Sequence, residues 1–139
     1  MDLNLSGTAL DGIEAAKDIR TKTGTQVLLL TAYEDEGIIL SASKKAFASG
    51  YIFKSQFMDI ADVIYRTATS NTVEKTRIKY SVLKDLTGAE AAVFKGYLEG
   101  NLNKYTYASP STTEKQLLNV YRKLGVKSGK ELMRVFGNW

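Results

Sequence analysis

Apolar positions follow two different periods along the first half of the chain. Residues 26–32 and 51–53 are short and almost continuously apolar, which is typical of parallel strands covered on both faces. Around them, apolar side chains recur every three or four residues, which predicts amphipathic helices. These helical stripes are Ile13, Ala16 and Ile19; Ile39, Ala42, Ala46 and Phe47; and Phe57, Ile60, Ala61 and Ile64. The alternation of strands and helices predicts an α/β fold for this half.

Local signals predict where the first helices begin and end. Residues 34–36 are acidic and suit a helix N-terminus, where the positive end of the dipole stabilises anions. Gly50 suits the end of that helix, because glycine adopts the left-handed cap conformation at little cost. Residues 21–25, composed of Thr, Lys and Gly, predict a loop before the first strand.

Beyond residue 74 only the helical period remains. Three capping boxes, each a Ser or Thr followed three residues later by Glu, are predicted at Thr87–Glu90, 111–114 and 128–131. Each box precedes an apolar stripe, namely Val93, Phe94, Tyr97 and Leu98; Leu117, Val120, Tyr121 and Leu124; and Leu132, Val135, Phe136 and Trp139. This half is therefore predicted to be an all-α bundle.

A Ser/Thr/Asn-rich stretch at residues 67–72 separates the two patterns. We therefore expect a first domain at residues 1–68, a partly helical linker at 69–84 and a second domain at 85–139. Charge divides similarly, because residues 1–73 carry a net charge of −2 and residues 74–139 one of +6. The basic half suits a polyanionic partner, although an ordinary solvated surface explains the same charge equally well.

Composition narrows the possible chemistry and location. The chain has no cysteine and no histidine, which excludes disulfides, thiolate metal sites and histidine-dependent catalysis. The longest aliphatic run, residues 27–30, is far shorter than the roughly 20 residues of a membrane helix. Met1 is followed by Asp2 rather than by a basic segment, so we expect no secretory signal. We expect a cytoplasmic protein that makes no membrane contact and is not an enzyme.

Three separated motifs in the first half point to a known family. They are DLNL at 2–5 with DGIE at 11–14, LTA at 30–32, and GYIFK at 50–54. In this order they resemble the later part of a bacterial response-regulator receiver domain, over residues 1–68. The resemblance implies an incomplete flavodoxin-like fold. It also implies that Asp2 is the phosphoacceptor candidate, that Thr31 and Tyr51 are switch residues, and that Lys54 binds the phosphoryl group.

Departures from the receiver pattern limit what this resemblance implies. The first strand, helix and strand of that family, with the acidic pair that holds magnesium, have no counterpart here. We therefore expect no magnesium cofactor and no phosphorylation unless a longer protein supplies that pair, in which case a sensor histidine kinase is the expected partner. The remaining two or three strands should expose apolar side chains. Ser55 replaces the usual proline, so no cis peptide bond is expected there.

The second half resembles another family over residues 80–135. Leu86-Thr87 with Glu90, and NVYRKLGVKS at 119–128 followed by Glu131-Leu132, resemble the LuxR-type helix-turn-helix output domain. The resemblance implies a scaffold helix opening at Asn103-Lys104 and a recognition helix in the DNA major groove. The implied DNA-binding residues are Lys104, Thr112, Lys115, Gln116, Asn119, Arg122, Lys123 and Lys127. Glu114 stands where the family has lysine and would repel phosphate.

Together these features predict a transcription regulator that binds double-stranded DNA as a homodimer. The alternative is a protein-interaction module, or a fragment derived from a response regulator, that binds no DNA. Exchange of helices between two chains is the expected way to complete the sheet.

Overall fold

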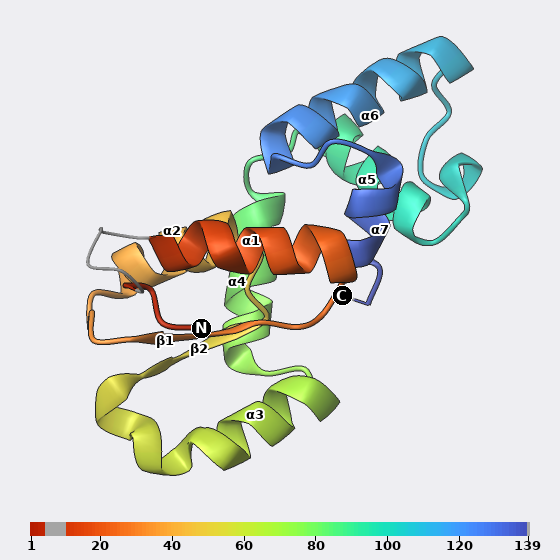
Figure 1. The fold of residues 1–139 in the computed structure, drawn as a ribbon. Coiled ribbons are helices and arrows are strands. Elements are labelled where there is room, and N and C mark those ends of the chain that lie inside the picture. Colours follow the sequence, from red (N-terminus) through yellow and green to blue (C-terminus); the bar gives the residue numbers. More distant parts are fainter. Residues whose placement is uncertain (5–10, 139) are drawn as a thin grey trace. The chain divides into compact units, whose positions relative to one another are not determined.

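A computed structural model describes residues 1–4 and 11–138, which form two compact units, Met1–Ser81 and Val82–Trp139. Leu5 of the first motif and Trp139 of the last stripe lie outside the described residues. Helices predominate over a small parallel sheet, so the mixed α/β class is confirmed (Figure 1). None of the described helices combines the length and apolar character that crossing a bilayer requires.

The sheet of the first unit contains both predicted strands. β1 (Leu28–Thr31) and β2 (Gly50–Phe53) run parallel, in register from their first residue to their last. The first residues of the chain lie along the other edge of β1, where the Leu30 amide donates to the Met1 carbonyl over 2.7 Å. β1 therefore has hydrogen-bonded neighbours on both sides.

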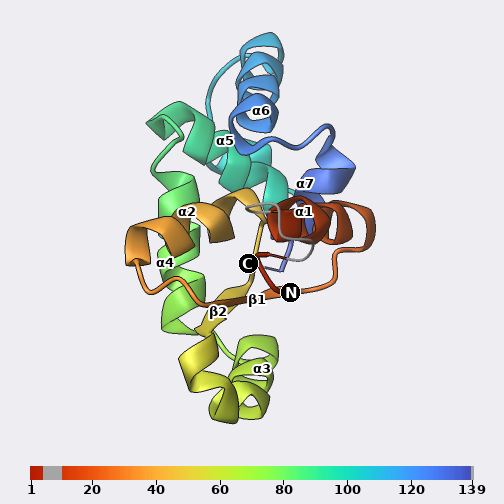
Figure 2. The ribbon, with the colours of Figure 1, turned by 60° about the vertical axis from the view of Figure 1, so that its left-hand side comes forward.

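Helices lie on both sides of this sheet. α1 (Asp11–Thr23) and α2 (Glu36–Lys45) lie on one side and α3 (Ile60–Thr69) on the other (Figures 1 and 2). Asp35 caps α2 by accepting from the Ile38 amide over 2.9 Å, which confirms the acidic helix start. The core of this unit consists of Leu3, Ala16, Val27, Leu29, Ile39, Ala42, Ala46 and Ala48.

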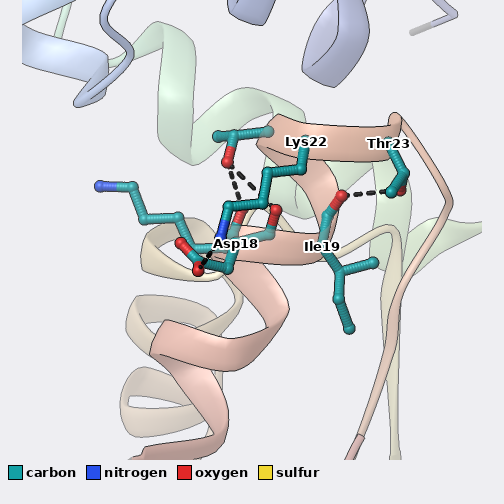
Figure 3. A network of polar contacts seen from close by, with 6 residues as sticks. Asp18, Ile19, Lys22 and Thr23 are labelled. Atoms are coloured by element: carbon teal, nitrogen blue, oxygen red, sulfur yellow. Dashed lines mark hydrogen bonds and ion pairs between the residues drawn. The ribbon is translucent and has the colours of Figure 1, made fainter.

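α1 continues through residues 21–23, where the sequence predicted a loop. The Thr23 hydroxyl donates to the Ile19 carbonyl over 2.7 Å, one turn earlier in the helix. Lys22 Nζ lies 2.6 Å from Asp18 Oδ2, and this ion pair also joins two successive turns of α1 (Figure 3). These contacts between successive turns hold a polar segment in helical conformation, so the predicted loop was wrong for these three residues.

The expected end of α2 at Gly50 is also wrong. The helix ends at Lys45, and Phe47 adopts the left-handed conformation with φ 54°. Burial of the Phe47 ring offsets the strain of this backbone conformation in a bulky residue. Gly50 opens β2 instead, where a Cβ atom would lie 3.1 Å from Leu28 Cδ1. Gly50 therefore allows close packing, not a helix cap.

α3 is amphipathic as predicted, but its apolar side faces solvent. It follows the 3-10 helix η1 (Lys54–Asp59), and Phe57 and Ile64 are 54% and 51% exposed. Thr67 is the buried residue of α3, and it lies close to Gly50 of β2. The described sheet is too narrow to cover a whole helix on this side. The side chains of β1 and β2 are buried or half-buried, so the expectation that the strands themselves expose apolar side chains is wrong. The exposed apolar side chains lie in η1 and α3, and we call Phe57 of η1 with Ile60, Ala61 and Ile64 of α3 the α3 stripe.

α4 (Val73–Leu83) occupies most of the predicted linker, residues 69–84. The boundary between the two units along the chain falls between Ser81 and Val82, within this helix. Most of the expected linker therefore belongs to the first unit. Residues 73–83 of the expected linker are helical.

The second unit contains the predicted bundle. Its helices are α5 (Gly88–Leu98), α6 (Pro110–Leu124) and α7 (Gly129–Phe136). The rings of Phe94 and Phe136 meet edge to face, with centroids 5.5 Å apart. The buried apolar residues of this unit are Val82, Val93, Phe94, Val120, Leu124, Val126, Leu132, Val135 and Phe136.

The capping boxes are confirmed in part. The Thr87 amide donates to the Glu90 carboxylate over 2.8 Å, and the Glu90 amide donates to the Thr87 hydroxyl over 3.2 Å. Ser128 caps α7 by accepting from the Glu131 amide, but the Glu131 carboxylate accepts from the Lys127 amide. In the third box the carboxylate therefore accepts from the residue before the cap, Lys127, instead of from the cap residue Ser128 itself.

The predicted box at residues 111–114 is wrong, because α6 begins earlier. Ser109 is the N-cap and accepts from the Thr112 amide over 3.3 Å, with Pro110 as the first helical residue. Proline suits this position because its fixed φ is helical and it has no amide hydrogen to leave unpaired.

The scaffold helix implied at Asn103-Lys104 is not formed. The described chain has there only the 3-10 helix η2 (Leu102–Lys104). Glu99 fixes this segment, because its carboxylate accepts from the Tyr105 hydroxyl over 2.6 Å and pairs with Lys104 at 3.3 Å. These two contacts hold residues 102–105 in a short turn, where the resemblance implied a scaffold helix.

Candidate functional site

Asp2 and Lys54 form an ion pair at the carboxyl ends of the strands. Asp2 Oδ2 lies 2.6 Å from Lys54 Nζ, and Asp2 Oδ1 accepts from the Asn4 amide over 3.1 Å. The hydrogen bond from Lys54, and after it the one from Asn4, holds the pKa of Asp2 below its usual value. The fold therefore brings the phosphoacceptor candidate and the phosphate-binding lysine candidate together.

The two switch candidates lie inside the same unit. Thr31 is the last residue of β1 and is buried, and its hydroxyl accepts from the Tyr33 amide over 3.0 Å. Tyr51 on β2 is partly buried against the core and meets the Phe53 ring edge-on, with centroids 5.9 Å apart. The threonine and the tyrosine are thus held on adjacent strands by backbone and packing contacts.

The residues at this edge do not fit a magnesium ion. Magnesium requires a nearly octahedral set of oxygen ligands. Among the described residues, no group of three or more His, Cys, Asp or Glu side chains is placed to hold a metal ion. Asp2 offers one carboxylate, and that carboxylate already pairs with Lys54.

In the second unit, one side of α6 carries an exposed line of side chains. Ser111, Lys115, Leu118 and Arg122 are spaced by four, three and four residues, so they share one side of the helix. All four are exposed, whereas Val120 on the opposite side is buried. We call these four residues the α6 stripe. α5 and α7 lie on the packed side of α6 (Figures 1 and 2).

Four implied DNA-binding residues lie on or beside this surface, with different degrees of exposure, and a fifth lies beyond the end of α6. Lys115 and Arg122 belong to the α6 stripe, and neither forms an ion pair within the part of the chain that the structure describes. Thr112 is exposed in the first turn of α6, and its hydroxyl accepts from Ser109 over 2.9 Å. Asn119 is half-buried beside the stripe, and Lys127 is exposed beyond the helix end.

Of the three other implied residues, two form ion pairs within the protein and the third is half-buried. Lys123 pairs with Glu90 at 2.7 Å, and Lys104 pairs with Glu99. Gln116 is half-buried on the packed side of α6, and its Oε1 atom is fully buried. Sequence reasoning assigned these side chains by position in the motif, but packing between helices turns them away from the α6 stripe.

Sequence reasoning also missed two members of the α6 stripe, Ser111 and Leu118. The capping-box pattern assigns Ser111 to a helix cap, and the buried stripe through Leu117 and Val120 does not include Leu118. The signal was available, since both residues fall on the helical line through Lys115 and Arg122.

Charge separates the two units. The first contains ten Lys and Arg and ten Asp and Glu, whereas the second contains nine and five, for a net charge of +4. The exposed cations of the α6 stripe therefore lie in the basic unit.

Comparison with known proteins gives no assignment, because no protein-family model matches the chain and no curated protein matches it significantly.

Proposed function

We propose that the chain is a DNA-binding transcription regulator of the response-regulator type, whose second unit holds duplex DNA against the α6 stripe. The observation that supports this most strongly is the position of Lys115 and Arg122, exposed on the side of α6 opposite Val120. An α-helix is about 10–12 Å across, which suits a major groove about 12 Å wide. Lysine and arginine bind both phosphates and guanine edges.

A homodimer is the proposed binding form. One helix of this length contacts few base pairs, and two copies on paired half-sites bind more tightly than one. Gene control of this kind takes place in the bacterial cytoplasm, which is the location we propose. In this proposal the second unit is a divergent relative of the LuxR-type helix-turn-helix domain, with the 3-10 helix η2 in place of the scaffold helix.

We propose that the first unit is an incomplete receiver of flavodoxin-like type that does not accept a phosphoryl group as it stands. The pairing of Asp2 with Lys54 supports the kinship, and the lack of a magnesium-binding group among the described residues argues against the reaction. The chain is thus proposed to act without enzymatic activity. A sensor kinase is a partner only for a longer protein that supplies the acidic pair.

Fluorescence anisotropy with a labelled duplex tests DNA binding by the full chain. At low salt we expect saturable binding that weakens when Lys115→Glu or Arg122→Glu is introduced. Lys45→Glu is the matched control, because Lys45 is exposed on α2 of the first unit and its reversal changes net charge equally. A flat titration with folded protein would contradict the proposal.

The α3 stripe favours a second candidate, a protein-interaction module. Phe57 of η1 and Ile64 of α3 expose apolar surface on two successive helical segments, and such surfaces commonly mark protein contacts. This function predicts self-association or partner binding that Ile64→Ser weakens, together with no affinity for duplex DNA. Sedimentation velocity of the two proteins, beside the anisotropy titration, distinguishes the candidates.

A further inference from the structure

Leu118 is an unusual member of the α6 stripe. It is 53% exposed, and its nearest neighbours on the stripe are the cations Lys115 and Arg122. The residues that pack α6 into its unit, Val120 and Leu124, lie on the opposite side. Glu114 is also exposed, one helical turn before Leu118, and lies beside the stripe. Leu118 is therefore an exposed apolar side chain with a cation on either side along the stripe and one carboxylate beside it, and the packing of the helix does not explain it.

We propose that Leu118 is a specificity-determining residue that recognises the C5 methyl group of thymine in the major groove. This inference rests on the proposed function. Base-pair edges in the major groove display hydrogen-bond donors, acceptors and one apolar group, the thymine methyl. An exposed leucine on a groove-facing helix has that methyl as its complementary partner.

Charge favours DNA as the occupant of this side of α6, because of the three exposed charges that the structure describes on or beside the stripe, two are cations and only Glu114 is an anion. Lys115 and Arg122 flank the leucine, and neither forms an ion pair among the residues that the structure describes. The whole unit carries a net charge of +4. A purely apolar protein partner would leave both cations desolvated without counter-charges, which is costly.

The helical spacing also predicts the arrangement of bases. Lys115 and Leu118 are separated by roughly 4.5 Å along the helix axis, at about 1.5 Å per residue. Stacked base pairs are about 3.4 Å apart, so the two side chains address neighbouring pairs. Because lysine prefers the O6 and N7 atoms of guanine, the preferred site should place thymine within one or two base pairs of guanine.

Selection and methyl deletion test this assignment directly. The full chain is used to select its preferred sequence from a pool of random duplexes. Each thymine of that duplex is then replaced by deoxyuridine, which removes only the methyl group. We expect a loss of affinity of about fourfold at one position, the value of burying one methyl group. In Leu118→Ala the thymine and uracil duplexes should bind equally.

A control variant and separate readouts keep the outcomes distinct. Met133→Ala removes another exposed apolar side chain of the second unit, on α7, and should retain the thymine preference. Duplex binding with no thymine preference, or with a preference that persists in Leu118→Ala, overturns the assignment while DNA binding stands. Absence of any duplex binding overturns the proposed function itself. Loss of self-association in Leu118→Ala without duplex binding would assign the stripe to a protein contact instead.

Discussion

Lys123 Nζ lies 2.7 Å from Glu90 Oε2 and joins the last turn of α6 to the first turn of α5. The Glu90 carboxylate is buried and also accepts from the Thr87 amide. The hydrogen bond from Lys123, and after it the one from Thr87, lowers the pKa of Glu90 from its usual 4.5. A lysine that the motif assigned to DNA phosphates thus stabilises the bundle.

Substitution Lys123→Met should lower the free energy of unfolding by about 1–2 kcal/mol, because it leaves a buried carboxylate short of one charged donor. The pKa of Glu90 is lower in the folded state, so the pair contributes fully above pH 4.5 and less as pH falls through the folded pKa. Urea unfolding should therefore show a gap between variant and wild type that narrows in acid. Lys127→Met, at an exposed cation, is the control, and an equal gap at all pH values would contradict this account.

Gly12→Ala should destabilise the first unit. A Cβ atom at Gly12 would lie 1.9 Å from the Asp2 carbonyl oxygen, which is backbone and cannot swing away. We expect a loss of about 1–3 kcal/mol in thermal or urea unfolding, typical of overpacking. Gly88→Ala is the matched control, since nothing lies within 4 Å of that position at the start of α5. Equal stability of Gly12→Ala and the wild type would contradict the close approach of the Asp2 carbonyl to Gly12.

Substitutions at two serines test where α6 begins. Ser109→Ala removes the side chain that caps the helix and should cost about 1 kcal/mol. Ser111→Ala removes an exposed hydroxyl within the first turn and should change stability little. Helical circular dichroism during thermal unfolding measures both, and the reverse order of effects would support a helix that begins after Ser111.

Sequence patterns predicted the elements of this fold more reliably than their contacts. The continuous apolar run before Thr31 and the stripe through Val120 and Leu124 each identify a buried line of side chains, and periodicity alone predicts such lines. The left-handed turn at Phe47 escaped prediction because it depends on where the ring is buried, which local sequence does not encode.

The candidate sites show the same division. The neighbouring positions of Asp2 and Lys54 follow from strand order, so the resemblance to a receiver could anticipate them. The pairing of Lys123 with Glu90 joins residues far apart in the sequence, and only helix packing decides it. A motif assigns residue types to positions, but it does not say which cations remain exposed.

Phosphorylation of Asp2 should not occur in this chain. The carboxylate pairs with Lys54, and no group of three or more His, Cys, Asp or Glu side chains among the described residues is placed to hold magnesium. Intact mass after incubation with a small phosphodonor and magnesium should remain unchanged. A mass gain of one phosphoryl group that disappears in Asp2→Ala would contradict this prediction.

The salt dependence of duplex binding tests the central claim most directly. If the α6 stripe contacts DNA, the logarithm of affinity should fall linearly with the logarithm of salt concentration. The slope should become shallower in Lys115→Gln and in Arg122→Gln, by roughly 0.9 where the lost cation contacts a phosphate. Lys115→Gln should in addition lose the preference for guanine near the thymine. Lys104→Gln, at a lysine already paired with Glu99, should leave the slope unchanged. Binding that is absent at low salt, or whose slope ignores Lys115 and Arg122, would contradict the assignment of this helix to DNA.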